Sequence, residues 1–388
     1  MKKRINFGIA LLLGSVLVLM MMPNTSMSNG ELILSPKEEL GKKLFFDENL
    51  SISLDQSCAT CHAPETGFTG PDSDINAGPA IYPGSIHTKF GNRKPPTAAY
   101  GGESPVRFEE DPCFFVGGMF WDGRATGWTL GEPLAEQALG PFLNFLEQAQ
   151  PKAKLVCLKV KHLSEYADLF EDVWGVGSLD CKNGLEETYN NIGLSIAAYE
   201  KSIEVNPFNS KYDAVQAGSA TFTEEELRGE VVFNGPGMCV ACHVRDGAGP
   251  SGEDLFTDFT YDNLGVPKNP ENPFYDAVRK FNPEGEDWID PGLGGFLATT
   301  SGLYENDYSD CVDGNYGKHK VPTLRNVDKR PYPEFVKSYG HNGYFKSLEQ
   351  IVHFYNTRDS KDTCPLNDDG SVYTAEQAIE ADCWPAPE

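Results

Sequence analysis

The chain has 388 residues, enough for two domains of ordinary size, each with a buried core of its own. Its formal net charge is −25 at pH 7, which excludes nucleic acid as a partner, because binding a phosphate backbone requires a basic surface. The same acidic surface would attract small basic proteins and steer their approach.

The first 28 residues are predicted to be a signal peptide that is removed from the mature protein. A basic start at Lys2, Lys3 and Arg4 precedes an apolar run without charge at residues 7–22, and small residues at 25–28 supply a cleavage site. An uncleaved membrane anchor is the alternative, but the run is short for a membrane-spanning helix. We therefore expect a periplasmic or otherwise exported protein.

Two segments share the spacing C-x-x-C-H. They are Cys58-Ala59-Thr60-Cys61-His62 and Cys239-Val240-Ala241-Cys242-His243. Two thiols at this spacing can form thioethers with the two vinyl groups of one haem, and the adjacent histidine can bind the iron. A zinc site would require a further ligand cluster, and a redox dithiol would not need the histidine twice. The sequence therefore predicts two covalent haem c groups, with His62 and His243 as iron ligands.

The surroundings of the two motifs also repeat. A capping box with a following glycine and apolar pair occurs twice, 188 positions apart, at Ser35-Pro36-Lys37-Glu38 and Thr223-Glu224-Glu225-Glu226. Each predicts a helix that packs over the haem attached after it. We expect a mainly α fold of two tandem cytochrome c-like domains with long loops, at residues 29–212 and 213–388.

Six cysteines remain outside the haem motifs. They are Cys113, Cys157, Cys181, Cys311, Cys364 and Cys383. An even number in an oxidising compartment predicts up to three disulfides, whose pairing cannot be read from the sequence. Proximity alone suggests that Cys364 pairs with Cys383.

Taken together, these motifs identify a resemblance. The chain resembles the bacterial di-haem cytochrome c peroxidases and their relatives of the MauG type, over essentially the whole mature length. The matching segments lie at residues 40–47, 67–68, 120–124, 136–141, 264–267, 321–326 and 341–343, in the order that the family shows.

The resemblance implies different roles for the two haems. The haem held by His62 would be peroxidatic, open on its distal side, and the one held by His243 would be six-coordinate and would receive electrons. Gln137 and Glu147, ten residues apart, would lie over the open iron. The Glu147 carboxylate would take a proton from one peroxide oxygen and return it to the other.

Trp121 resembles the tryptophan that lies between the two haems and helps electrons to cross. The alternative is a packing tryptophan at a domain interface. The chain departs from the simple peroxidases here, because an insertion around residues 126–133 separates Trp121 from Gln137.

A second departure concerns the other axial ligand of the C-terminal haem. The peroxidases use a methionine, and none of the seven methionines of this chain lies beyond His243. Tyr316 is our first candidate for this ligand and His319 the second, followed by Tyr332 and His341. A tyrosinate would favour ferric iron, as in the MauG-type proteins, which have His/Tyr ligation.

Two further features of the family have candidates in the chain. His87 precedes residues 91–97, where a histidine often caps the N-terminal iron until the other haem is reduced; a surface histidine is the alternative. A calcium ion is usual between the domains, but Lys94 stands where an asparagine ligand often lies. Asn92 and the carbonyls of Gly265 and Pro267 remain as candidate calcium ligands.

Three functions follow from these observations. The first is a peroxidase that reduces hydrogen peroxide to water with electrons from a small cytochrome c or a cupredoxin. The second is a MauG-like oxidase that uses peroxide-derived high-valent iron to oxidise a protein or an organic substrate. The third is an electron-transfer module without peroxide chemistry, against which Gln137 and Glu147 argue. The family is often dimeric, which leaves a homodimer open.

Overall fold

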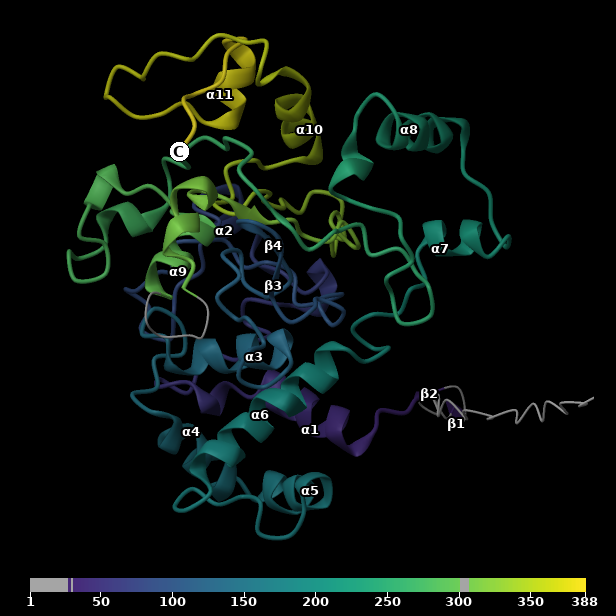
Figure 1. Cartoon of the computed structure of the whole chain (residues 1–388), viewed down its shortest axis with the longest axis vertical. Helices are drawn as coiled ribbons and strands as arrows, with labels where there is room; N and C mark the ends of the chain where they lie inside the picture. The colour runs from purple at the N-terminus through teal and green to yellow at the C-terminus, as the bar shows by residue number, and fades with distance from the viewer. Residues whose placement is uncertain (1–26, 29–30, 301–306) are drawn as a thin grey trace, which may run out of the picture. The chain divides into compact units, whose positions relative to one another are not determined.

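Helices make up most of the regular structure, as predicted, and long loops join them (Figure 1). The computed structural model describes residues 27–28, 31–300 and 307–388, and no helix in these ranges is long and apolar enough to span a membrane. Its N-terminal unit, residues 1–33, contains the antiparallel pair of β1 (Met27–Ser28) and β2 (Glu31–Leu32). The predicted signal peptide lies almost wholly outside the described residues. All elements below belong to the second unit, residues 34–388.

The first predicted capping box begins a helix where we expected one. α1 (Pro36–Phe46) follows Ser35, whose hydroxyl accepts from the Glu38 N–H at 3.4 Å, while the Glu38 carboxylate accepts from the Ser35 N–H at 2.6 Å. The buried face of the helix consists of Leu40, Gly41, Leu44 and Phe45. α1 packs so closely on α6 (Leu185–Glu200) that a Cβ on Gly41 would lie 1.9 Å from the Ser195 carbonyl oxygen.

The first half is completed by α2 (Ser73–Ala77), α3 (Pro133–Leu143), α4 (Ala153–His162) and α5 (Ser164–Trp174). α6 is central to this half, because α1, α3 and α4 all pack on it. The core between them includes Phe45, Phe142, Phe170, Ile192 and Ile196. Cys58 packs against this core, which therefore supports the first C-x-x-C-H segment directly.

The second half contains α7 (Lys211–Gln216), α8 (Glu224–Asn234), α9 (Gly292–Thr299), α10 (Leu348–Thr357) and α11 (Ala375–Glu380). α8 begins at the second predicted capping box, where Thr223 Oγ1 accepts from the Glu226 N–H at 3.2 Å. Unlike α1, it has no buried residue. α10 and α11 lie side by side (Figure 1) and enclose a separate core around Phe345, Phe354 and Trp384.

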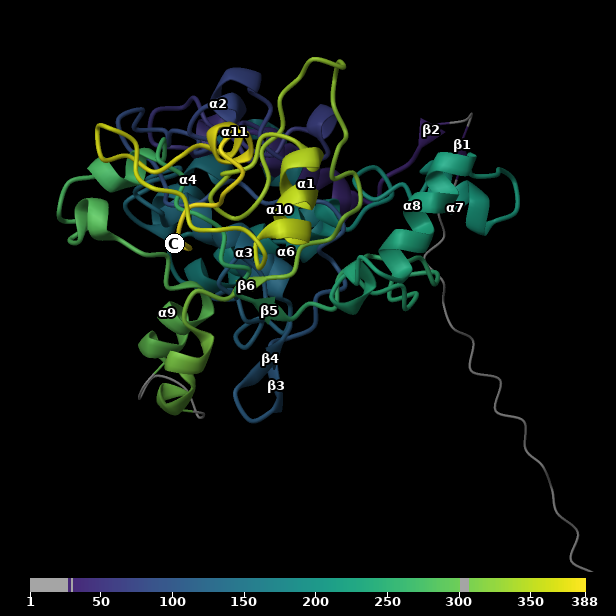
Figure 2. The same cartoon turned by 90° about the horizontal axis from the view of Figure 1, so that it is seen from above.

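Short strands and single turns of 3₁₀ helix connect the helices. β3 (Phe108–Asp111) pairs with β4 (Phe114–Val116), and β5 (Tyr261–Asp262) pairs with β6 (His319–Lys320), both antiparallel. The β3–β4 hairpin and α9 extend in the same direction (Figure 2) and share an apolar cluster. The 3₁₀ turns are η1 (Glu48–Leu50), η2 (Pro64–Thr66), η3 (Cys239–Ala241), η4 (Pro273–Asp276), η5 (Gly285–Asp287), η6 (Ser309–Cys311) and η7 (Asp313–Asn315).

Three disulfides use all six cysteines outside the haem motifs. The bond between Cys364 and Cys383 confirms the pairing suggested by proximity. The other two bonds join Cys157 to Cys181 and Cys113 to Cys311. The last of these ties the β3–β4 hairpin to η6 across 198 residues of sequence. Three disulfides are consistent with export to an oxidising compartment.

Candidate haem sites

The four cysteines of the C-x-x-C-H segments are the ones that remain as free thiols. In each segment the chain turns so that the histidine N–H donates to the carbonyl of the first cysteine at 2.9 Å, His62 to Cys58 and His243 to Cys239. This turn places both thiols and the imidazole of a segment within one short stretch of backbone. The donor set is the one that a c-type haem requires.

Both motif histidines are held through Nδ1. The His62 Nδ1 lies 3.2 Å from the Phe68 carbonyl oxygen, and the His243 Nδ1 lies 2.9 Å from that of Phe256. A carbonyl acceptor at Nδ1 fixes the proton there and leaves Nε2 as the free ligand atom. Burial lowers the pKa of His62 to about 4 and also lowers the pKa of His243, so both rings are neutral at pH 7. Both segments therefore fit a haem iron.

The same supporting hydrogen bonds recur around each motif. Thr97 Oγ1 donates to the Gly67 carbonyl at 2.8 Å, and Thr323 Oγ1 donates to the Leu255 carbonyl at 2.6 Å. Both threonines follow a proline. The two acceptor carbonyls belong to the residues just before Phe68 and Phe256, the phenylalanines that hold the motif histidines. This correspondence supports an internal repeat that extends well beyond the capping boxes.

The two halves also bind each other reciprocally. The Lys94 N–H donates to the His341 carbonyl at 2.9 Å, and the Lys320 N–H donates to the Trp121 carbonyl at 2.8 Å. Trp121 Nε1 in turn donates to the Lys94 carbonyl at 2.9 Å. Trp121 is therefore hydrogen-bonded to residues of both halves, as a residue between the two haem sites would be; its role in electron transfer stays a prediction.

The charge of Glu147 acts on the two thiols of the first motif. Glu147 follows the end of α3, where its N–H donates to the Asn144 carbonyl at 3.0 Å. Burial and the charge of Glu147 raise the pKa of the Cys61 thiol to about 12. Burial raises the pKa of Glu147 itself, while Arg124 and Asn144 lower it in part. Gln137 is half-buried on α3, the helix that leads to this loop.

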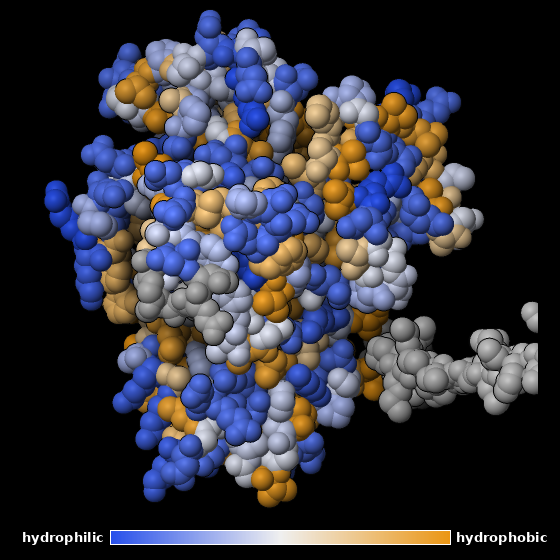
Figure 3. All heavy atoms as spheres, in the orientation of Figure 1, coloured by the Kyte–Doolittle hydropathy of each residue, from blue (hydrophilic) through white to orange (hydrophobic). Residues whose placement is uncertain are grey.

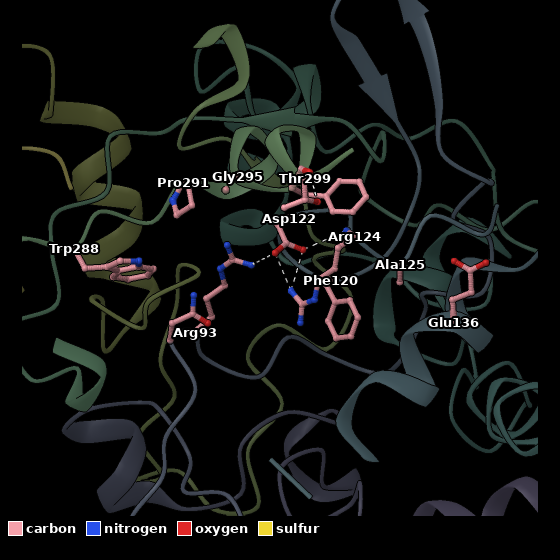
Figure 4. A pocket seen from close by; sticks show the side chains of 13 residues that line it. Arg93, Phe120, Asp122, Arg124, Ala125, Glu136, Trp288, Pro291, Gly295 and Thr299 are labelled. Atoms are coloured by element: carbon pink, nitrogen blue, oxygen red, sulfur yellow. Dashed lines mark hydrogen bonds and ion pairs between the residues drawn. The ribbon is translucent and has the colours of Figure 1, made fainter. Parts of the chain in front are cut away.

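A cavity of about 610 Å³ is lined by residues of both halves, among them Arg93, Asp122 and Trp288 (Figure 4). Asp122 lies between two arginines, with Arg93 Nη1 at 2.6 Å and Arg124 Nη1 at 2.8 Å. Arg124 stacks over the Phe120 ring at 3.7 Å, and Arg93 also binds Asp290. This network was not predicted from the sequence, although Arg93 and Asp122 both lie in or beside segments that match the family.

The candidate axial ligands fall into two groups. His87 is 73% exposed, and its Nε2 lies 2.8 Å from Asp55 Oδ2. Tyr316 and Tyr332 are about half exposed, at 48% and 49%. The His319 and His341 side chains are instead only 10% and 9% exposed, and their rings stack on each other. No geometry in the described residues selects one of these as a haem ligand, and the assignments stay predictions.

Tyr355 belongs to an apolar stripe at helical spacing that the sequence predicts at Leu348, Ile351, Val352 and Tyr355, and it lies on α10. Partial burial and the charge of Cys242 raise the pKa of Tyr355, which is 47% exposed. Two residues named as candidate calcium ligands already accept hydrogen bonds through their carbonyls. The Pro267 carbonyl accepts from Asn342 Nδ2 at 2.9 Å, and the Asn92 carbonyl accepts from Asn272 Nδ2 at 3.0 Å.

Comparisons with known proteins agree with this geometry. The family model of the di-haem cytochrome c peroxidases (CCP_MauG) matches residues 35–221. The methylamine utilization protein MauG of Paracoccus denitrificans is 34% identical over 322 residues, covering 83% of this chain and 74% of the relative. The cytochrome c551 peroxidase of Nitrosomonas europaea is 29% identical over 321 residues, covering 81% and 71%. The crystal structure of the diheme peroxidase BthA from Burkholderia thailandensis has a TM-score of 0.68 at 30% identity, covering 84% of this chain and 75% of that one. The chain belongs to the di-haem cytochrome c peroxidase and MauG family of oxidoreductases.

Proposed function

We propose that this protein reduces hydrogen peroxide to water with electrons from a small cytochrome c or a cupredoxin. The observation that carries the proposal is the half-buried carboxyl of Glu147, whose charge acts on Cys61 of a C-x-x-C-H segment whose histidine is held through Nδ1. A haem bound there supplies the iron that binds peroxide and passes electrons to it. Cys58 and Cys61 would hold this haem covalently, and His62 would bind its iron.

Glu147 is suited to hold and move a proton. Its raised pKa favours the protonated carboxyl more than an exposed glutamate would, so one oxygen can donate while the other accepts. Arg124 and Asn144 act against this shift and keep the carboxylate form accessible. Gln137, half-buried on the preceding helix, is the proposed amide partner that orients the substrate.

Electrons would enter through the second half of the chain. Cys239, Cys242 and His243 would hold the electron-transfer haem, and the boundary at residues 212–213 would separate it from the peroxidatic half. Trp121 is the proposed link, because its ring N–H and its carbonyl are bonded to Lys94 and Lys320, one in each half. An acidic surface, with a net charge of −25, would attract a basic donor in the periplasm.

A MauG-like oxidase is the second candidate. The absence of methionine beyond His243 favours it, and so does the 34% identity with a MauG protein. In this case Tyr316 is the proposed second ligand of the C-terminal haem. A calcium ion between the two haem sites remains part of either proposal.

The two proposed functions predict different reactions of the haem-loaded protein with hydrogen peroxide. One equivalent of hydrogen peroxide is added to the fully oxidised and, separately, to the half-reduced protein, followed by visible and EPR spectroscopy. Reaction only after half-reduction is expected for the peroxidase, with His87 as the gate that must leave Asp55. Reaction of the fully oxidised protein would favour the oxidase and make Tyr316 the next residue to substitute. If peroxide changed the spectrum of neither the oxidised nor the half-reduced protein, both proposed functions would be contradicted.

A further inference from the structure

Four titratable side chains, all at least nine-tenths buried, gather where the two halves meet. They are Asp290, His319, His341 and Glu388, whose side chains are 2%, 10%, 9% and 5% exposed. They come from four separate segments of the chain, since His319 lies on β6 and Asp290 immediately precedes α9. The cluster is not part of either C-x-x-C-H segment.

The two imidazoles have ligand atoms without partners. Their rings lie face to face, with centroids 3.6 Å apart and planes inclined by 13°. Nε2 of His319 lies 3.3 Å from Asp290 Oδ2, and Nε2 of His341 lies 4.0 Å from the same oxygen. Both Nε2 atoms are buried and make no hydrogen bond. Buried polar atoms are rarely left unsatisfied, so each one requires an explanation.

The acidic side chains are held in place by other groups. Arg93 donates to both oxygens of Asp290 at 2.6 Å, and the Gly292 N–H donates to Oδ1 at 2.9 Å. Glu388 accepts from the Tyr275 hydroxyl at 2.8 Å, and its Oε2 lies 3.6 Å from Nε2 of His341. Such outer hydrogen bonds orient the carboxylates that bind metal ions. Arg93 is itself paired with Asp122, so its charge is shared.

We propose that Asp290, His319 and His341 bind one divalent transition-metal ion of the Zn²⁺ class, with Glu388 as a fourth ligand. The Asp290 oxygen and the two Nε2 atoms all lie within 4.8 Å of one another. Imidazole nitrogen selects zinc and its neighbours, whereas Ca²⁺ and Mg²⁺ prefer oxygen. Bond lengths of about 2.0–2.2 Å require the two rings to tilt out of their stack toward the ion.

The position of the site gives the ion a structural consequence. Lys320, next to His319, donates its N–H to the Trp121 carbonyl, and the His341 carbonyl accepts from Lys94. An ion bound to both histidines would therefore stabilise the hydrogen bonds that join the two halves near Trp121. The proposal does not depend on which reaction the haems carry out.

The test uses the haem-loaded protein, stripped with a chelator and titrated with Zn²⁺. Elemental analysis, with haem iron as the internal count of chains, is expected to give one tightly held zinc ion per chain, and zinc should raise Tm. His319→Gln is expected to lose this ion while keeping the haem spectrum of the wild type. Asp290→Asn is the second variant, and His353→Gln, a half-buried histidine outside the cluster, is the matched control.

Three results would overturn the proposal. Wild-type protein that retains no zinc after dialysis has no such site. Equal retention by wild type and His319→Gln would mean that zinc binds elsewhere, and displacement of the zinc by excess Ca²⁺ would exclude an imidazole site. A changed low-spin haem signal in His319→Gln would instead assign His319 to a haem iron.

Discussion

The two haem segments have similar local sequences but very different surroundings. α1 and α8 both begin at a capping box, yet α1 buries Leu40, Leu44 and Phe45 while α8 buries none of its residues. Cys58 packs on the first core, and Cys239 is exposed. Apolar side chains accordingly reach the surface on and near α8 (Figure 3), at Leu227, Val231, Val232 and Met238.

Local sequence therefore decides where each helix begins, whereas the burial of a helix depends on what packs against it. In the first half the protein supplies that partner, because α6 covers α1. In the second half we infer that the haem itself supplies it, so the first site is built largely by the fold and the second is completed by its cofactor.

The largest expected difference concerns the carboxylates beside the two motifs. Glu147→Gln removes the proposed acid–base group of the first site and is expected to lower kcat for peroxide by about 10²–10⁴-fold. Asp262 Oδ2 accepts from Cys242 Sγ at 3.4 Å in the second site, so Asp262→Asn is the matched change. It should alter kcat by less than about threefold, because no peroxide chemistry is assigned there. Steady-state assays measure both values, and an equal loss of kcat in Glu147→Gln and Asp262→Asn would contradict the different roles proposed for the two sites.

Removing the covalent anchor should affect the two helices unequally. The double change of Cys239 and Cys242 to Ala should leave α8, an 11-residue helix without a buried face, close to unfolded, because isolated helices of this length are marginal in water. The same change of Cys58 and Cys61 should leave α1 protected by α6. Amide hydrogen exchange measures both helices in one experiment. Protected α8 amides in the first variant would show that protein contacts alone hold that helix.

Truncating equivalent phenylalanines should separate the two cores. Phe45 is completely buried, so Phe45→Ala is expected to lower the free energy of unfolding by about 3–5 kcal/mol. Phe233, which contacts Phe256 at a ring distance of 6.0 Å but is not fully buried, should cost less than half as much. Phe46→Ala, at a neighbouring position that is 40% exposed, is the control. Denaturant titration gives all three values, and equal costs for Phe45 and Phe233 would contradict the comparison.

The sequence predicted features that are encoded locally. Both capping boxes, the two C-x-x-C-H turns and the bond between Cys364 and Cys383 depend on residues fewer than 20 positions apart. The bond between Cys113 and Cys311 could not be predicted in this way, because 198 residues separate the two cysteines. Pairings at such distances are set by the packing of the whole chain.

The candidate site also combines features that are encoded locally with features that depend on long-range packing. Glu147 was predicted from the resemblance to the family, ten residues after Gln137, and in the structure its charge acts on Cys61. The stacking of His319 on His341 gave no signal in the sequence, where each was only a candidate haem ligand. Their contact requires β6 and the loop before α10 to meet, which no local pattern records.

The smallest expected effect concerns the capping boxes. Ser35→Ala and Thr223→Ala each remove one hydrogen bond to an N–H of the first turn, at a cost of about 0.5–2 kcal/mol of helix stability. The loss at α1 should lower the global unfolding midpoint, because α1 is part of the first core. The loss at α8 should appear as faster amide exchange within that helix, with the global midpoint unchanged. Ser210→Ala, in the capping box of α7, is the control for a cap on a helix without buried residues. An equal fall in midpoint for Ser35→Ala and Thr223→Ala would mean that α8 unfolds together with the core, and that the second site is built by the protein as firmly as the first.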